Sequence, residues 1–154
     1  MTGPVVHTRE RFALIAHAPF ELAWPLFGAH KEREWAPDWN PSFVWPEKAV
    51  DREGMVFKIR RGDKTAIWVN TVFDETTRRI QYVYLIPGVV VTVITLQLEP
   101  DGDSTRVEVV YERTALADAA NETVGDMAAS DRIAGEEWSR QINAYLRQRY
   151  PPLD

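Results

Sequence analysis

The longest regular pattern in this chain lies near its C-terminal end, from Asn121 to Arg149. Mostly apolar side chains recur there at spacings of three and four residues, which is the period of an amphipathic helix. The positions on this stripe are Val124, Met127, Asp131, Ala134, Trp138, Ile142, Tyr145 and Leu146. At 1.5 Å per residue the helix would be about 40 Å long, and Pro151-Pro152 would stop it. A helix of that length with one apolar stripe must lie across a sheet.

The opposite side of this helix is predicted to face solvent. Its positions are Arg132, Glu136, Arg140, Asn143 and Arg147. Two glycines interrupt the helix, Gly125 and Gly135, and each would weaken it by roughly 1 kcal/mol relative to alanine. We therefore expect a close approach or pocket space beside them.

The middle of the chain has the pattern of β-strands joined by tight turns. The predicted strands are residues 9–16, 55–60, 65–73, 80–86, 89–98 and 105–114. Arg61-Gly62-Asp63-Lys64, Pro87-Gly88 and Pro100-Asp101-Gly102-Asp103 supply turn chemistry between the later strands. Strands joined by such short turns pair antiparallel, so the sequence predicts a meander.

Residues 17–46 separate the first strand from this meander. Four of the six tryptophans fall here, Trp24, Trp35, Trp39 and Trp45, interleaved with five prolines. Ala18-Pro19 predicts a short helix, since proline suits the first helical position, and a second short helix is expected around residues 29–35. Large aromatic rings in a stretch where proline prevents long helices and central strands predict a stiff flap over a ligand cavity.

Composition narrows the class of protein. At 154 residues the chain is expected to be a single domain, residues 1–154. It has no cysteine, which excludes thiolate chemistry and favours a reducing, cytoplasmic setting. The net charge of −5 argues against nucleic acid as a partner.

No membrane span is expected either. Residues 80–98 carry no formal charge, but Pro87-Gly88 in their middle indicates a hairpin rather than a helix. The N-terminus lacks the pattern of a signal peptide. The three histidines, His7, His17 and His30, are scattered, and no nucleotide-binding motif occurs, so neither a metal site nor a cofactor is predicted.

Four segments together resemble those of a known superfamily. They are Ala18-Pro19-Phe20-Glu21-Leu22-Ala23-Trp24, Trp35-Ala36-Pro37-Asp38-Trp39, residues 73–82, and the helix segment carrying Trp138, Ile142, Tyr145 and Leu146. Their order is similar to the helix-grip fold of START and birch-pollen-allergen-like proteins, the SRPBCC superfamily, nearest its polyketide cyclase/dehydrase-like branch. The resemblance implies an α+β fold in which a curved antiparallel sheet wraps around the long C-terminal helix, with two short helices after the first strand.

That resemblance also implies a cavity for a small hydrophobic or amphipathic molecule. Arg113 shares its strand face with Val107, Val109 and Tyr111 and points inward. It either reaches the rim and extends to water, or it grips a ligand oxygen as a fixed cation. Asp131, on the apolar stripe, either pairs with Arg113 or a sheet hydroxyl, or acts as a general base whose pKa burial has raised.

The aromatic residues leave similar alternatives. Tyr82 and Tyr84 share one strand face, and their hydroxyls either polarise a ligand carbonyl or bond to the backbone of the core. Either face of residues 65–73 can be inward, so the role of Trp68 is open. Trp138 is expected in the core, and His17 is expected to cap the first short helix. The predicted ligand-binding set is Trp35, Trp39, Trp68, Tyr82, Tyr84, Tyr111, Arg113, Met127, Asp131 and Trp138, with Asp131 and Tyr82 as catalytic candidates.

Three functions fit this set. The first is a carrier or sequestering module for a small hydrophobic molecule. The alternative is a polyketide cyclase/dehydratase-like enzyme that uses the same cavity, with a tyrosine polarising a keto group and Asp131 moving a proton. A weaker alternative is a co-chaperone-like protein-interaction domain. The sequence leaves the oligomeric state open.

Overall fold

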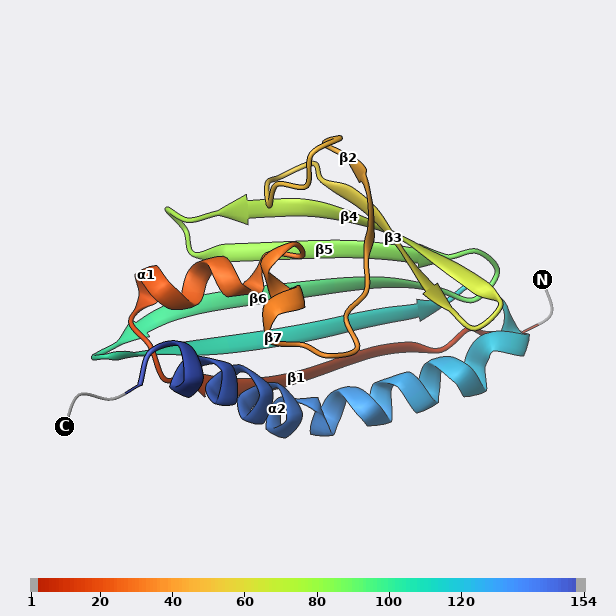
Figure 1. Ribbon diagram of the computed structural model, residues 1–154. Coiled ribbons are helices and arrows are strands. Elements are labelled where there is room, and N and C mark those ends of the chain that lie inside the picture. Colours follow the sequence, from red (N-terminus) through yellow and green to blue (C-terminus); the bar gives the residue numbers. More distant parts are fainter. Residues whose placement is uncertain (1–2, 152–154) are drawn as a thin grey trace.

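The computed structural model describes residues 3–151 as one curved sheet, one long helix and a flap (Figure 1). The sheet is antiparallel, with the strand order β1-β7-β6-β5-β4-β3-β2. The strands are β1 (His7–Ala16), β2 (Ser42–Trp45), β3 (Val56–Arg61), β4 (Lys64–Asp74), β5 (Arg79–Ile86), β6 (Val90–Asp101) and β7 (Ser104–Ala115). The helices are α1 (Phe20–Ala23), η1 (Trp24–Phe27), η2 (Lys31–Glu34), η3 (Asp118–Ala120) and α2 (Asn121–Arg149). The predicted helix-grip architecture is confirmed.

One face of the sheet forms the core. Alternate residues of β5 are buried, namely Ile80, Tyr82, Tyr84 and Ile86, because successive side chains of a strand point to opposite faces. On β4 the buried set is Ala66, Trp68 and Asn70, whereas Ile67 is 40% exposed. The structure thus decides what the sequence left open: the Trp68 face of β4 is the inward one.

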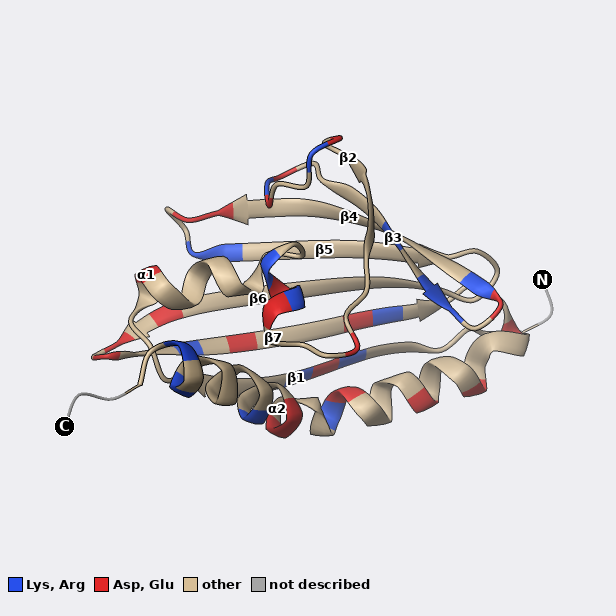
Figure 2. Cartoon of the chain, in the orientation of Figure 1, with Lys and Arg blue, Asp and Glu red and all other residues tan. Residues whose placement is uncertain are grey.

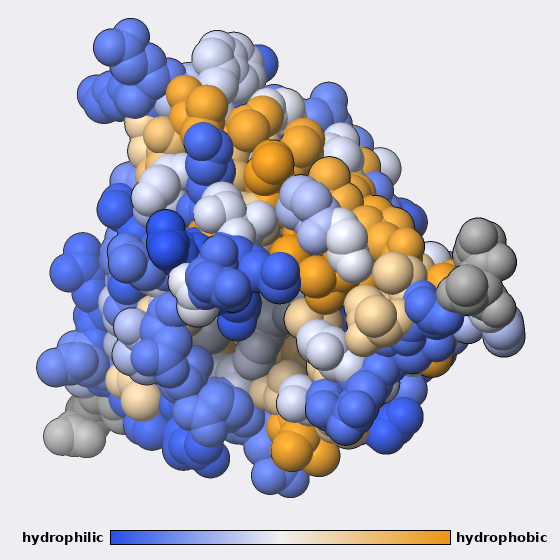
Figure 3. All heavy atoms as spheres, turned by 90° about the vertical axis from the view of Figure 1, so that its right-hand side faces the viewer, coloured by the Kyte–Doolittle hydropathy of each residue, from blue (hydrophilic) through white to orange (hydrophobic). Residues whose placement is uncertain are grey.

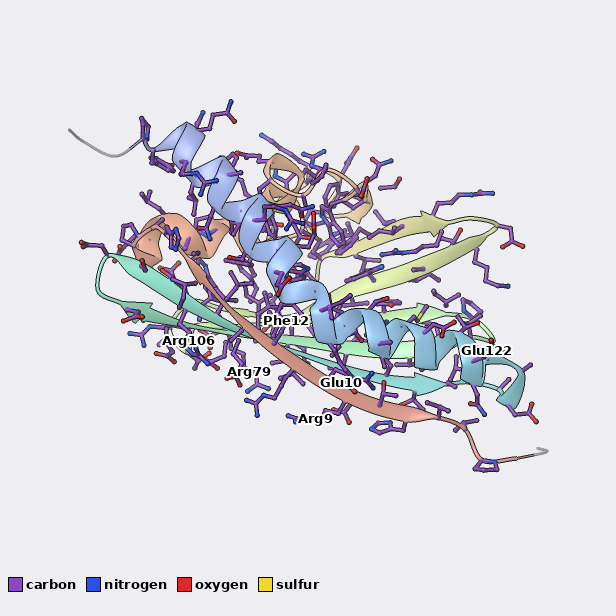
Figure 4. The ribbon with its side chains drawn as sticks, turned by 90° about the horizontal axis from the view of Figure 1, so that it is seen from below. Arg9, Glu10, Phe12, Arg79, Arg106 and Glu122 are labelled. Atoms are coloured by element: carbon purple, nitrogen blue, oxygen red, sulfur yellow. The ribbon has the colours of Figure 1, made fainter. Side chains whose placement is uncertain are left out.

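The long helix α2 runs along β1 and β7 at the edge of the sheet (Figure 1). Figure 4 shows Phe12 of β1 beside α2, and Arg9 nearer the N-terminal end of the same strand. The Phe12 ring meets that of Trp138 edge-on, with ring centroids 5.2 Å apart. Glu10 forms an ion pair with Arg132, with 3.0 Å between Oε1 and Nε. Among the described residues, no helix is long and apolar enough to cross a membrane.

One position on α2 was predicted wrongly. Asn143 was expected to face solvent, but it is only 4% exposed. Its side-chain oxygen accepts a hydrogen bond from the His17 backbone N–H at 2.8 Å, and its amide nitrogen donates to the Ile15 carbonyl at 2.9 Å. These backbone groups lie where β1 ends, so Asn143 supplies partners there.

The flap differs from the prediction in detail. The first short helix is one turn of α-helix followed by a 3₁₀ turn at Pro25, and the second is the single 3₁₀ turn η2. The edge strand β2, which pairs with β3, was not predicted. His17 does not cap α1, because Pro19 occupies the cap position and no side chain bonds there. Trp138 is half-buried rather than a core residue.

The two helix glycines have different surroundings, which gives a matched test. A Cβ atom on Gly135 would lie 3.0–3.3 Å from Phe12, whose ring is held against Trp138, whereas a Cβ on Gly125 meets nothing within 4 Å. We expect Gly125→Ala to stabilise the protein by up to about 1 kcal/mol and Gly135→Ala to destabilise it by about 1 kcal/mol. Urea unfolding measures both, and equal gains for the two variants would contradict this packing.

Candidate functional site

A cleft of about 300 Å³ opens between the flap, the sheet and α2, and a cavity of about 30 Å³ lies next to it. The two share a wall formed by Glu32, Trp39, Trp68, Tyr111 and Trp138. Because they share these residues, we treat them as one site with an outer and an inner part. Its volume is at the lower end of the range, roughly 300–1,000 Å³, that small-molecule pockets span.

The structure brings together most of the predicted site residues, though not all. Those that line the outer cleft are Trp39, Trp68, Tyr84, Tyr111, Arg113 and Trp138. Tyr82 lines only the inner cavity, whereas Trp35, Met127 and Asp131 line neither part. The Trp35 indole instead donates to the Leu26 carbonyl at 2.7 Å and holds the flap.

The walls of the site are aromatic and packed against one another. Trp68 stacks on Tyr84 with ring centroids 4.4 Å apart and meets Trp39 edge-on at 5.4 Å. The Trp39 indole donates to the Ala29 carbonyl at 2.7 Å, which fixes the ring to the flap. Rings held in this way form a rigid apolar slot suited to a flat ligand.

Arg113 and Asp131 form a buried ion pair behind this wall. Their residues are 6% and 5% exposed, and the contacts are Nε to Oδ2 at 2.7 Å and Nη2 to Oδ1 at 2.8 Å. The interpretation that Arg113 reaches the rim is therefore wrong, and the ion-pair alternative for Asp131 is the arrangement found. Burial acts to lower the pKa of Arg113, but its bonds to Asp131 and Tyr84 outweigh this and raise that pKa.

Hydrogen-bond donors of the sheet wall that have no acceptor among residues 3–151 include those of Tyr84 and Trp68. The Tyr84 oxygen accepts from Arg113 Nη1 at 2.5 Å, so the proton of its own hydroxyl must point elsewhere. The Trp68 indole N–H is buried and has no partner. By contrast, the Tyr82 hydroxyl donates to the Phe27 carbonyl at 2.9 Å. Of the two interpretations of Tyr82, the one found is therefore a hydroxyl that bonds to the backbone of the core.

Glu32, which lines both parts of the site, was not among the predicted site residues. Its carboxyl group has no hydrogen-bond partner in the part of the chain that the structure describes. Glu32 is half-buried by accessible surface, because the cleft reaches it. The protein that surrounds the carboxyl group nevertheless disfavours its charged form. Burial, and secondly the charge of Asp51, raise the pKa of Glu32 to about 8.

Glu32 was missed because it lies in the run Lys31-Glu32-Arg33-Glu34, which looks like solvated surface. One signal was present. Side chains three residues apart eclipse in a 3₁₀ helix, so Glu32 lies on the same side as Trp35. Since Trp35 is buried, the carboxylate in front of it also faces inward.

The turn that carries Glu32 is fastened on two sides. The Asp51 carboxylate accepts from the backbone N–H groups of His30, at 2.7 Å, and Lys31, at 3.2 Å. The Tyr145 hydroxyl of α2 donates to Glu34 at 2.6 Å. Burial raises the pKa of Asp51 despite these bonds. The backbone turn that carries Glu32 is thus held by contacts that do not involve the Glu32 carboxyl group.

The mouth of the cleft is polar. Asp38, Arg61 and Gln141 line it, as does Glu137, which binds Arg140. Figure 2 shows charged residues on η2 and along α2, and Figure 3 shows a hollow with hydrophilic residues on one side and neutral to hydrophobic residues on the other. Within residues 3–151 no three His, Asp or Glu side chains cluster closely enough to hold a metal ion.

Glu32 should make stability depend on pH. The unfolded chain loses this proton near the ordinary pKa of 4.5, whereas the folded protein keeps it up to about pH 8. The folded state therefore binds more protons in this window, and its stability falls as pH rises. We expect Glu32→Gln to be more stable than wild type at pH 8 by on the order of 2 kcal/mol, a value discounted for water in the cleft, and unchanged at pH 4.

Urea unfolding between pH 4 and 8.5 measures this difference. Glu34→Gln is the matched control on the same turn, because the Tyr145 hydrogen bond lowers the pKa of Glu34 and its variant should lose stability above pH 4.5. A Glu32→Gln difference that does not vary with pH would refute the raised pKa.

The ion pair gives a second prediction. Asp131→Ala leaves a buried guanidinium without its counter-charge and should cost about 3–5 kcal/mol of unfolding free energy. The double variant Arg113→Met/Asp131→Leu should recover most of that loss, because no buried charge remains. Urea unfolding of Arg113→Met, of Asp131→Leu and of the double variant that combines them gives the coupling energy, and additive losses would show that the residues act separately.

Comparison with known proteins places this fold. No family model and no curated protein matches the sequence. Among solved structures, truncated norcoclaurine synthase from Thalictrum flavum superposes with a TM-score of 0.70 at 11% identity, covering 99% of each chain. An aromatase/cyclase from a Streptomyces species gives 0.68 at 13% identity, covering 95% of this chain and 98% of that one.

A third structure, of a Rhizobium loti protein, gives a TM-score of 0.65 at 17% identity and covers 94% of this chain and 100% of that one. At these identities the likeness establishes the fold and not the activity. The chain therefore has the helix-grip fold that its sequence segments indicated, and it shares this fold with norcoclaurine synthase and an aromatase/cyclase.

Proposed function

We propose that this protein, as a single domain of residues 1–154, binds a small aromatic molecule through an oxygen atom that accepts hydrogen bonds. The observation that carries the proposal is the buried indole N–H of Trp68, which has no partner among the described residues. Leaving a buried donor unpaired costs about 1–3 kcal/mol, and an acceptor on a ligand removes that cost.

The surroundings of Trp68 support the same class of ligand. Tyr84, which stacks on Trp68, has a hydroxyl proton to donate because Arg113 occupies its oxygen. Glu32 is protonated at neutral pH, since its pKa is about 8, and so is also a donor there. Three donors in an aromatic slot favour a carbonyl or phenolic oxygen on a flat ring system.

Related folds hold molecules of this kind. Norcoclaurine synthase has been solved in complex with dopamine and hydroxybenzaldehyde, a structure that superposes on this chain with a TM-score of 0.68 at 13% identity. Carrier and enzyme functions both fit a site for such a ligand. The cyclase alternative with Asp131 as base has less support, because Arg113 occupies both oxygens of that carboxylate. A cytoplasmic setting rests on the cysteine-free sequence.

The test compares two ligands that differ only in the oxygen. We expect 2-tetralone to quench the tryptophan fluorescence of the protein and to bind more tightly than tetralin, which lacks the carbonyl. Trp68→Phe keeps an aromatic ring but removes the N–H, and it should weaken 2-tetralone binding roughly 3- to 10-fold without affecting tetralin.

Trp45→Phe is the control, because Trp45 is 48% exposed and lines neither part of the site. Equal affinity of wild type for 2-tetralone and tetralin would overturn the proposal. Native mass spectrometry of the purified protein adds an independent check, since a bound molecule that leaves on denaturation identifies the natural ligand class directly.

A further inference from the structure

One of the three donors in the site comes from the flap and not from the sheet. Glu32 lies on η2, whereas Trp68 and Tyr84 lie on β4 and β5, and all three line the cleft. Figure 1 shows the flap crossing in front of these strands. A ligand whose oxygen bonds to the sheet wall is therefore met by a carboxyl group from a different element. This arrangement places a proton acceptor and two oxygen-binding donors around one small molecule.

We propose that Glu32 is a catalytic acid–base residue that moves a proton to and from the carbon next to a ligand carbonyl. In the forward step the Glu32 carboxylate takes a proton from this carbon, and the C–H electron pair forms a C=C bond. The carbonyl π electrons move to oxygen, where Tyr84 and Trp68 donate to the enolate. In the reverse step Glu32 returns the proton to carbon. The inference rests on the proposed binding function and requires no co-reactant.

The donors suit this chemistry because they are fixed before a ligand arrives. The ion pair with Asp131 holds Arg113, and Arg113 holds the Tyr84 oxygen at 2.5 Å and the Thr92 hydroxyl at 3.0 Å. Donors that need no rearrangement stabilise negative charge on oxygen better than water does. Asp131 and Arg113 are thus positioning residues that act through Tyr84.

Glu32 suits the role better than the other acids near the cleft. Both Asp131 oxygens are bound to Arg113, and Glu137 is bound to Arg140 and Gln141. Asp38 is exposed at the mouth. A base is most effective when its pKa is close to the working pH, and that of Glu32 is about 8.

The titratable and charged groups around Glu32 come from several elements. They are Asp51 from the loop behind η2, Tyr82 on β5, Tyr111 and the paired Arg113 on β7, and Asp38, Arg61 and the paired Glu137 at the mouth. Burial and the Glu32 charge raise the pKa of Tyr111 further, so that hydroxyl keeps its proton and does not compete as a base.

The experiment measures exchange of the hydrogens next to the carbonyl of 2-tetralone for deuterium, by NMR in D₂O. We expect wild-type protein to accelerate exchange over buffer, with a rate that rises as Glu32 ionises around pH 8. Glu32→Gln, which keeps the shape of the side chain, should lower the rate at least 100-fold while the affinity for 2-tetralone changes less than 3-fold. Glu75→Gln, in the exposed turn after β4, should behave as wild type.

The outcomes separate this inference from the binding proposal. If wild type binds 2-tetralone but does not accelerate exchange, or if Glu32→Gln exchanges at the wild-type rate, Glu32 is not catalytic and the binding function stands. If 2-tetralone does not bind, the proposed function itself fails. Tyr84→Phe supplies a second variant: it should reduce the exchange rate more than it reduces affinity, since its hydroxyl bonds most strongly to the enolate.

Discussion

The ion pair between Arg113 and Asp131 is the contact on which the site depends. It is the one buried charge pair among the described residues, and it joins the strand β7 to the helix α2. Two parallel hydrogen bonds fix its geometry, so it also fixes how the helix lies against the sheet at that point. Replacing such a pair with apolar residues is often neutral for stability, so its value lies in orientation. Here it orients the hydroxyl of Tyr84.

The flap is an irregular segment that side-chain hydrogen bonds stabilise. It has few ladder hydrogen bonds, so side chains supply the missing partners: the indoles of Trp35 and Trp39 donate to flap carbonyls, and Asp51 accepts from the turn that carries Glu32. A Cβ atom on Gly28 would lie 2.3 Å from the Asp51 carboxyl group. The absence of a side chain at Gly28 therefore lets Asp51 reach the turn. The aromatic residues of the flap serve both to cover the cleft and to tie it down.

The groups that lack a partner among residues 3–151 include three whose residues line the same cleft. They are the carboxyl group of Glu32, the buried indole N–H of Trp68 and the hydroxyl proton of Tyr84, and each comes from a different element. Such groups lower stability when nothing binds to them. Elsewhere most buried polar side chains are paired, as Asn143 and Thr105 illustrate, but the Thr8 hydroxyl of β1 is buried without a partner among the described residues. Thr8 does not line the cleft, whereas Glu32, Trp68 and Tyr84 do.

Local sequence patterns were enough to predict this architecture apart from the edge strand β2. The period of 3.6 residues placed α2 at its observed bounds, and turn residues such as Pro87-Gly88 fixed the meander, because both signals are local. The sequence also pointed to most of the cleft residues, since inward positions follow from strand alternation.

Which of those polar groups lack a hydrogen-bond partner depends on how distant parts of the chain pack together. Whether Asp131 meets Arg113, whether Tyr82 finds the Phe27 carbonyl and whether Glu32 faces water or a cleft depend on partners distant in sequence. A local sequence pattern cannot specify such pairs. It indicates on which face of a strand or helix a side chain lies, but not which residue lies opposite that face. The ionisation of Glu32, and with it the chemistry that we propose, arises from that packing.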